Sequence, residues 1–176
     1  MAEDLRTLVA DSSSLIEIRQ RDLPQSKQAA VFRALTSLVE RDQLIFPPQV
    51  VEELEWGSGV RGEDQALLWI RSVRARAERS ANLGTVKAVL RRAPELIDAD
   101  SPRDQADPYV VALALDCDSI GGVSVLSDDR RDRPDGRGGI RKLSVATVAS
   151  IYDIPVTPLA GFIRRFIDPA LPWKPN

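Results

Sequence analysis

Short apolar segments that alternate with amphipathic helices constrain this fold more than any other feature of the chain. Segments at 5–10, 44–47 and 123–126 are rich in Leu, Val and Ile and end at polar or turn residues, as buried strands do. Between them, apolar residues recur at spacings of three and four, most clearly from Ala29 to Val39. Because strands that alternate with helices build parallel sheets, we expect an α/β fold with three layers, α/β/α, around a mainly parallel sheet of about five strands.

Capping and turn residues predict further elements. Paired prolines and Gly57 bound a helix in the segment PPQVVEELEWG, and Asp107 before Pro108 is typical of a residue that caps another helix. A short strand near 154–157 and a final helix follow. The glycine-rich segment RRDRPDGRGGIRK, residues 130–142, predicts a surface loop.

The central segment 64–92 is helical in composition, with a break near Asn82. It carries many arginines, Arg71 and Arg74 among them, and we interpret it as the basic side of the molecule. The chain has 176 residues, 43% of them hydrophobic, with no internal repeat and no long linker, which predicts a single domain over 1–176.

Composition excludes several kinds of site. The chain has no histidine, which excludes His-based triads, His general bases and His metal ligands. Its 24 basic and 26 acidic residues give a net charge of −2, so it is not a polycation that coats nucleic acid. The single Cys117 excludes an intramolecular disulfide and fits a reducing cytosol. Because no apolar run approaches the roughly 20 residues of a membrane span, and the first residues are acidic, we expect a cytoplasmic protein without a membrane partner.

Acidic residues follow the predicted strands. Asp11 follows the first strand, Glu52 and Glu53 follow the second, and Asp128 and Asp129 follow the strand at 123–126. Asp107 opens the helix that precedes this last strand. Ligands bind beyond the carboxyl ends of the strands in such sheets, so we expect these side chains to lie close together. Carboxylates gathered at one edge repel each other and stay ionised only if a cation bridges them, which favours Mg²⁺ or Mn²⁺. Such a metal can activate water and neutralise charge on a phosphodiester.

Each acid also has an ordinary structural interpretation. Asp11 and Asp107 can each cap the helix that follows. Glu53 can be a solvated helix residue, and Asp128 with Asp129 can form a turn. Their joint placement at one edge of the sheet favours a functional site.

Four short motifs, in order, resemble those of the PIN-domain family. TLVADSSSLIEI (7–18) resembles its hydrophobic first strand, which ends in Asp with Ser or Thr two positions on, and VVEELEWG (50–57) resembles its Glu-Leu helix. DQADPYVVALAL (104–115) resembles its Asp-x-x-Val/Ile-x-x-Ala helix, and VLSDDR (125–130) its strand that ends in Thr/Ser-x-Asp. The stretch ADPYVVALA resembles a branch of uncharacterised PIN proteins that includes the toxins of toxin-antitoxin pairs.

This resemblance implies a VapC-like endoribonuclease that depends on Mg²⁺ or Mn²⁺, cleaves RNA, forms a homodimer and is inhibited by a cognate antitoxin protein. It also implies four metal ligands and one supporting serine: Asp11, Glu53, Asp107 and Asp129, with Ser13. Asp104, three residues before Asp107, is an auxiliary candidate.

Two of the implied ligands have a neighbour that can replace them. In the helix after the second strand, Glu53 lies about 110° from the centre of the apolar face and Glu52 about 150°, at about 100° per residue, which favours Glu53. At the end of the last strand the family spacing favours Asp129, whereas Asp128 directly precedes it.

Arginines are candidates for phosphate contacts. Arg130 and Arg131 follow Asp129 in a segment that is longer and more polar than the family's usual continuation. These two residues, like Arg71 and Arg74, either contact RNA or are simply solvated.

Three other functions are alternatives. The stretch DSSS is similar to the Asp-x-Ser-x-Ser loop of von Willebrand-type binding modules, but Leu15 stands where the second serine belongs. Phosphatase chemistry of the haloacid dehalogenase type needs a second Asp where this chain has Ser13. The third alternative is a catalytically inactive PIN-like module that binds RNA or a metal-dependent partner.

Overall fold

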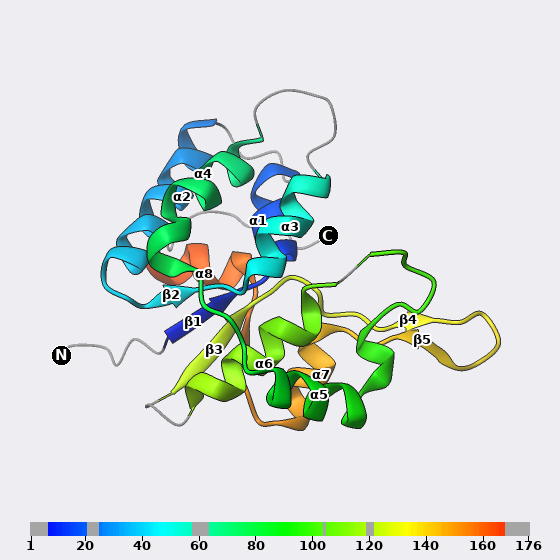
Figure 1. The fold of residues 1–176 in the computed structure, drawn as a ribbon. Coiled ribbons are helices and arrows are strands. Elements are labelled where there is room, and N and C mark those ends of the chain that lie inside the picture. The colour runs from blue at the N-terminus through cyan, green and yellow to red at the C-terminus, as the bar shows by residue number, and fades with distance from the viewer. Residues whose placement is uncertain (1–6, 21–24, 58–63, 104, 119–121, 168–176) are drawn as a thin grey trace.

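A parallel sheet lies at the centre of the computed structural model (Figure 1), which describes residues 7–20, 25–57, 64–103, 105–118 and 122–167. In the described residues the sheet has four strands, in the order β2 (Leu44–Ile45), β1 (Thr7–Ala10), β3 (Val123–Leu126) and β6 (Val156–Thr157). Val9 pairs with Ile45 on one side and with Val125 on the other. The predicted parallel arrangement is confirmed, with four strands where the sequence predicts about five.

Helices cover both faces of the sheet. One layer contains α1 (Ser12–Gln20), α2 (Gln25–Glu40), α3 (Pro48–Gly57), α4 (Gln65–Ala77) and α8 (Leu159–Phe166). The other contains α5 (Leu83–Arg92), the short 3-10 helix η1 (Pro94–Leu96), α6 (Asp107–Asp118) and α7 (Val145–Ile151). These three layers confirm the predicted α/β/α fold class.

α6 is the most apolar of the longer helices and packs against β1 and β3. Five consecutive residues of its middle are buried: Val110, Val111, Ala112, Leu113 and Ala114. A helix that is apolar on every side belongs inside the fold, and here α5 and α7 cover its outer surface. Because α6 connects to the start of the parallel strand β3, its first turn lies at the carboxyl edge of the sheet. This places Asp107 beside the ends of β1 and β3.

The segment 130–142 contains a β-hairpin, so its prediction as a surface loop is wrong in part. β4 (Arg133–Pro134) pairs antiparallel with β5 (Ile140–Lys142), and the hairpin projects from the body of the molecule (Figure 1). The carboxylate of Asp135 closes the turn by accepting hydrogen bonds from the backbone N–H groups of Arg137 and Gly139. Local turn chemistry forms this hairpin without an apolar pattern.

Two helix starts test the capping predictions. The predicted break in the central helical segment is confirmed, because α4 ends at Ala77 and Asn82 caps α5 by accepting a hydrogen bond from the N–H of Gly84. For the later helix the sequence predicts Asp107 as the cap. Instead α6 includes Asp107, and the carboxylate pairs with Lys142.

Among the residues that the structure describes, no helix is both long and apolar enough to cross a membrane.

Candidate functional site

A pocket of about 380 Å³ lies at the carboxyl edge of the sheet. Its lining includes six acidic side chains: Asp11, Glu17, Glu53, Asp107, Asp128 and Asp129. Lys142 and Arg133 also line it. Four separate stretches of chain thus bring the predicted ligands to one cavity, which we call the acidic pocket.

Asp11 lies at the base of this pocket, directly after β1, and is only 1% exposed. Its Oδ2 accepts hydrogen bonds from the hydroxyls of Ser13, at 2.5 Å, and Ser127, at 2.7 Å. Within the described residues, its Oδ1 has no hydrogen-bond partner. Burial raises the pKa of the Asp11 carboxyl to about 7, and the negative charge of Asp107 adds to the rise. A buried carboxylate oxygen without a partner is uncommon in folded proteins, and a proton, a water molecule or a cation can each satisfy it.

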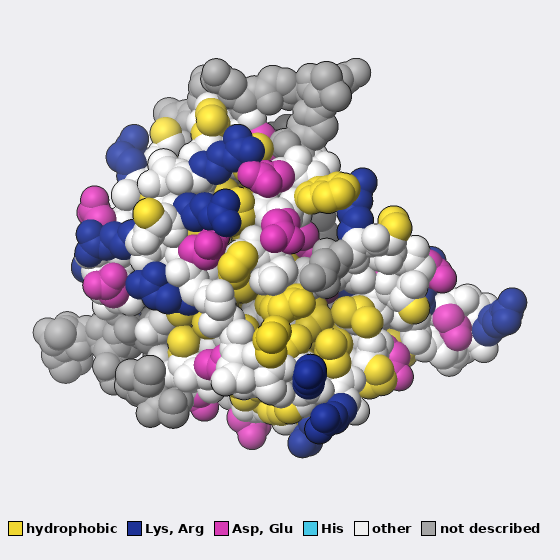
Figure 2. All heavy atoms as spheres, viewed as in Figure 1, with side chains coloured by type: hydrophobic (Ala, Val, Ile, Leu, Met, Phe, Trp, Pro, Cys, Tyr) yellow, Lys and Arg dark blue, Asp and Glu magenta, His cyan; other side chains and the backbone are white. Residues whose placement is uncertain are grey.

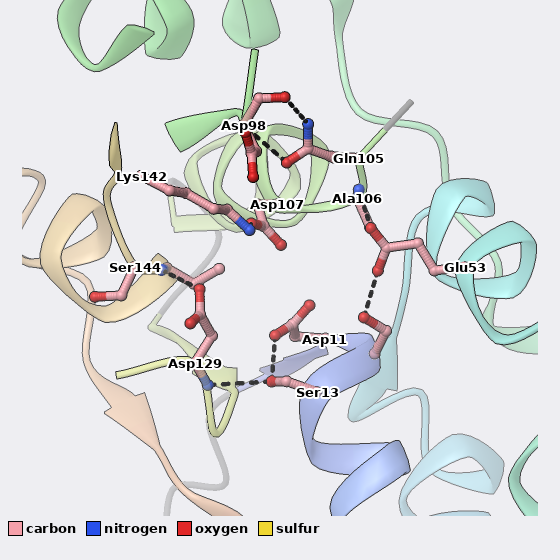
Figure 3. A network of polar contacts seen from close by, with 12 residues as sticks. Asp11, Ser13, Glu53, Asp98, Gln105, Ala106, Asp107, Asp129, Lys142 and Ser144 are labelled. Atoms are coloured by element: carbon pink, nitrogen blue, oxygen red, sulfur yellow. Dashed lines mark hydrogen bonds and ion pairs between the residues drawn. The ribbon is translucent and has the colours of Figure 1, made fainter. Parts of the chain in front are cut away.

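Ser13 fixes Asp11 in place. While its hydroxyl donates to Asp11, the same oxygen accepts from the backbone N–H groups of Asp128, at 3.0 Å, and Asp129, at 3.2 Å. Ser13 therefore links the start of α1 to the loop after β3, the geometry that a supporting residue requires (Figure 3).

The structure places Glu53, and not Glu52, against the acidic pocket. Oε1 of Glu53 accepts a hydrogen bond from the backbone N–H of Ala106, at 2.7 Å, and Oε2 accepts from the hydroxyl of Ser12. Glu52 is exposed and does not line this pocket. The sequence prediction, which preferred Glu53 because it lies closer than Glu52 to the apolar face of the helix, agrees with this placement.

Asp107 is 5% exposed and forms an ion pair with Lys142, whose Nζ lies 2.5 Å from Oδ2. Burial raises the pKa of Asp107 to about 6, although the ammonium group of Lys142 opposes the rise. Burial alone would lower the pKa of Lys142, but the charge of Asp107 raises it above its usual value. Sequence reasoning missed Lys142, because it follows a polar, glycine-rich stretch and only the hairpin turns it inward.

Asp128 and Asp129 face different neighbours. Oδ2 of Asp129 accepts from the N–H of Val145, the first residue of α7, at 3.0 Å. Oδ2 of Asp128 accepts from the Ser14 hydroxyl, at 2.8 Å, and from the N–H of Leu159. Figure 3 shows Asp129 beside Lys142 and opposite Asp107, which favours Asp129 as the fourth ligand.

The arginines predicted to contact RNA lie elsewhere. On α4, Arg71 pairs with Glu55 and Arg74 with Glu78. Over α2 and α4 basic and acidic side chains are interspersed (Figure 2). Arg130 and Arg131 are exposed and do not line the acidic pocket, whereas Arg133 does. RNA contacts of these arginines stay a prediction. Asp104 lies outside the described residues.

The carboxylates that line the acidic pocket have the chemical type and the negative charge that a hard divalent cation binds. Carboxylate oxygens are the ligands that Mg²⁺ and Mn²⁺ prefer, and Oδ1 of Asp11 is available. As they stand, no three acidic, His or Cys side chains among the described residues form a group that could hold a metal. In this arrangement Glu53 and Asp129 accept hydrogen bonds from backbone N–H groups, and Asp107 pairs with Lys142.

Neither a comparison with models of known protein families nor one with curated proteins gave a match, so an assignment of function has to rest on this pocket.

Proposed function

We propose that this protein is a Mg²⁺- or Mn²⁺-dependent endoribonuclease of the VapC-like, PIN-domain type. The observation that carries the proposal is the meeting of Asp11, Glu53, Asp107 and Asp129 at one pocket, with a buried oxygen of Asp11 left unsatisfied. These residues are also the four that the PIN-like motifs imply, and they come from distant parts of the chain.

Some of these side chains would bind the cation, and others would hold the ligands in position. Asp11 and Asp107 would hold the cation directly, since they are the most deeply buried acids, while Glu53 and Asp129 would complete the set or orient water. Ser13 and Ser127 hold the second oxygen of Asp11 so that Oδ1 faces the pocket. A bound divalent cation supplies charge that polarises a phosphodiester and lowers the pKa of water.

Lys142 and Arg133 bring positive charge to the same cavity. A phosphodiester carries one negative charge, and an acidic cavity repels it unless cations are present. Lys142 is positioned by β5 and Arg133 by β4, so the hairpin would supply this part of the substrate site. Fixed charges of this kind stabilise the charge that develops during phosphodiester cleavage.

Inhibition by an antitoxin protein, a homodimeric state and a cytoplasmic location are further parts of the proposal. The first two rest on the motif resemblance, above all on ADPYVVALA. The cytoplasmic location rests on the free Cys117, the only cysteine of the chain.

One observation favours an alternative function, a catalytically inactive module that binds RNA or a metal-dependent partner. Each of the four carboxylates already has donors within the protein: Asp11 with Ser13 and Ser127, Glu53 with Ala106 and Ser12, Asp107 with Lys142, and Asp129 with Val145. A network of this kind stabilises a fold without any chemistry.

Cleavage of a panel of single-stranded and structured RNAs by the purified protein in Mg²⁺, Mn²⁺ or EDTA separates the two functions. Asp11→Asn and Asp107→Asn should each abolish metal-dependent cutting. Asp118→Asn is the matched control, since Asp118 is an exposed aspartate at the other end of α6. Binding of RNA by the parent without cutting under any metal would favour the inactive module.

A further inference from the structure

A second cavity, of about 480 Å³, lies beside the acidic pocket. It shares two lining residues with that pocket, Ile16 of α1 and Glu53 of α3. Its other walls come from the last turn of α3, which carries Trp56, and from the loop before α6, which carries Arg103. The two cavities are therefore neighbours along one surface.

Trp56 and Arg103 form the distinctive part of this second cavity. The indole of Trp56 is 60% exposed, and the guanidinium carbon of Arg103 lies 4.3 Å from the ring centroid. Among the described residues, Arg103 makes no ion pair. Two other arginines also lie over aromatic rings, but neither pair lines this cavity or the acidic pocket: Arg92 on Tyr152 and Arg165 on Phe166.

Contacts hold Asp98 and Gln105, which lie on either side of Arg103 in the chain. The side-chain amide of Gln105 exchanges two hydrogen bonds with the backbone of Asp98, and Arg141 of the hairpin pairs with the Asp98 carboxylate (Figure 3 shows the first contact). A wall that is ordered before a ligand arrives costs less to bind against.

The chemistry of the cavity selects a flat aromatic group over a phosphate. Arg103 is its one cationic side chain within the described residues, and Glu52 and Glu53 lie on the facing wall, so a phosphate would be repelled. A nucleobase, in contrast, stacks on an indole and gains from a guanidinium over its face. The volume is within the range of pockets that hold small ligands.

The spacing along α3 relates this cavity to the acidic pocket. Trp56 lies three residues after Glu53, and residues three apart on a helix have Cβ atoms about 5–6 Å apart. A base on Trp56 would therefore belong to a nucleotide next to the phosphodiester at the carboxylates.

We propose that this second cavity binds an unstacked base of single-stranded RNA, next to the bond to be cut. The inference rests on the proposed function and adds to it a substrate requirement. Bases in a duplex are not available for stacking on a side chain, so the RNA has to be single-stranded at this position.

Binding in EDTA tests the base site without cleavage. Fluorescence anisotropy measures the affinity for a fluorescein-labelled decauridylate. Trp56→Ala should weaken binding about tenfold and Arg103→Gln a few-fold, while Trp56→Phe should keep most of the affinity. Leu83→Ala, which truncates a 65% exposed leucine outside both cavities, should bind as the parent does. Because stacking quenches an indole, RNA should quench fluorescence of the parent but not that of Trp56→Phe.

Cleavage in Mg²⁺ or Mn²⁺ separates this inference from the proposed function. Binding of RNA through Trp56 without any cutting would support the base site and defeat the endoribonuclease. Equal binding and cutting with and without Trp56 would overturn the base site and leave the nuclease. A parent that binds no oligonucleotide would overturn the base site as well. A labelled decapeptide with one central tryptophan is the comparison probe, and if it alone depends on Trp56, the cavity belongs to a protein partner.

Discussion

The ammonium group of Lys142 lies 2.5 Å from Oδ2 of Asp107, and both side chains are almost completely buried. The pair joins the end of the hairpin to the first turn of α6. It gives one of the buried carboxylates a counter-charge that the protein itself provides, which makes the acidic pocket less negative than its acids alone would.

Replacing Lys142 with methionine should leave Asp107 buried without its cation. Removing one partner of a buried ion pair strands the other charge, so we expect Lys142→Met to lower the free energy of unfolding by about 3 kcal/mol at pH 8 in EDTA. At pH 5 the loss should shrink, because Asp107 then takes up a proton. Urea denaturation at both pH values measures this. Arg141→Met, which removes the solvent-accessible ion pairs with Asp98 and Asp100, should change stability by less than about 1 kcal/mol, and equal losses in both variants would contradict the argument.

Stability of the metal-free protein should fall as the pH rises through the range set by Asp11 and Asp107. Burial raises the pKa values of these carboxyls from an ordinary 3.8 to about 7 and about 6. The folded state therefore binds more protons than the unfolded state, so unfolding free energy declines with rising pH and levels off above about pH 7. At about 1.4 kcal/mol per pKa unit, shifts of this size predict a decline of several kcal/mol in EDTA, on the order of 7. Urea titrations from pH 4 to 8, an interval that spans these values, measure it.

Two controls accompany this pH profile. Asp11→Asn removes the more strongly shifted group and should flatten most of the slope. Mn²⁺ added at pH 8 should restore stability to the parent but not to Asp11→Asn, since a ligand that binds the folded state stabilises it. If the unfolding free energy of the parent does not change with pH, burial does not raise the pKa values of these two carboxyls.

Ser13→Ala should weaken metal binding without removing a ligand. The substitution removes the hydrogen bond from Ser13 to Oδ2 of Asp11. It also removes the hydroxyl oxygen that accepts from the N–H groups of Asp128 and Asp129. Losses of about 10- to 100-fold in metal affinity are typical when such a supporting hydrogen bond is removed. Isothermal titration with Mn²⁺ measures the affinity, and Ser13→Thr should rescue it. Ser150→Ala, on the exposed side of α7, should have no effect.

Glu53→Gln and Glu52→Gln should differ sharply in cleavage. The first keeps the shape of the side chain but removes a charge at the acidic pocket, so we expect about a 100-fold loss of rate. The second changes a residue that lines only the second cavity, so it can alter RNA affinity but should leave the cleavage rate at saturating protein close to that of the parent. Single-turnover cleavage at saturating protein measures the rate, and a larger loss in Glu52→Gln would exchange the two assignments.

The sequence predicts those parts of the fold and site that depend on local pattern. Asp11 and Asp129 are recognisable because each follows a short buried strand, and parallel strands end at the same edge. Glu53 is distinguishable from Glu52 because the apolar face of α3 fixes the direction of both side chains.

Lys142 and the hairpin were not predictable in the same way. The turn signal of Asp135 before glycine was present but outweighed by the polar composition around it. No local pattern tells that a lysine after such a turn lies 2.5 Å from Asp107, because this contact depends on how β5 packs on the body. The role of Ser127 at Asp11 likewise depends on the pairing of β1 with β3.

The central position of β1 has a consequence for the order of assembly. Its partner β3 and the acid after it arrive more than a hundred residues later in the chain, and Lys142 and α7 later still. During synthesis the segment that carries Asp11 and Glu53 therefore emerges long before the residues that complete the pocket. Under the proposed endoribonuclease function, a growing chain would therefore stay inert until almost all of its fold has left the ribosome.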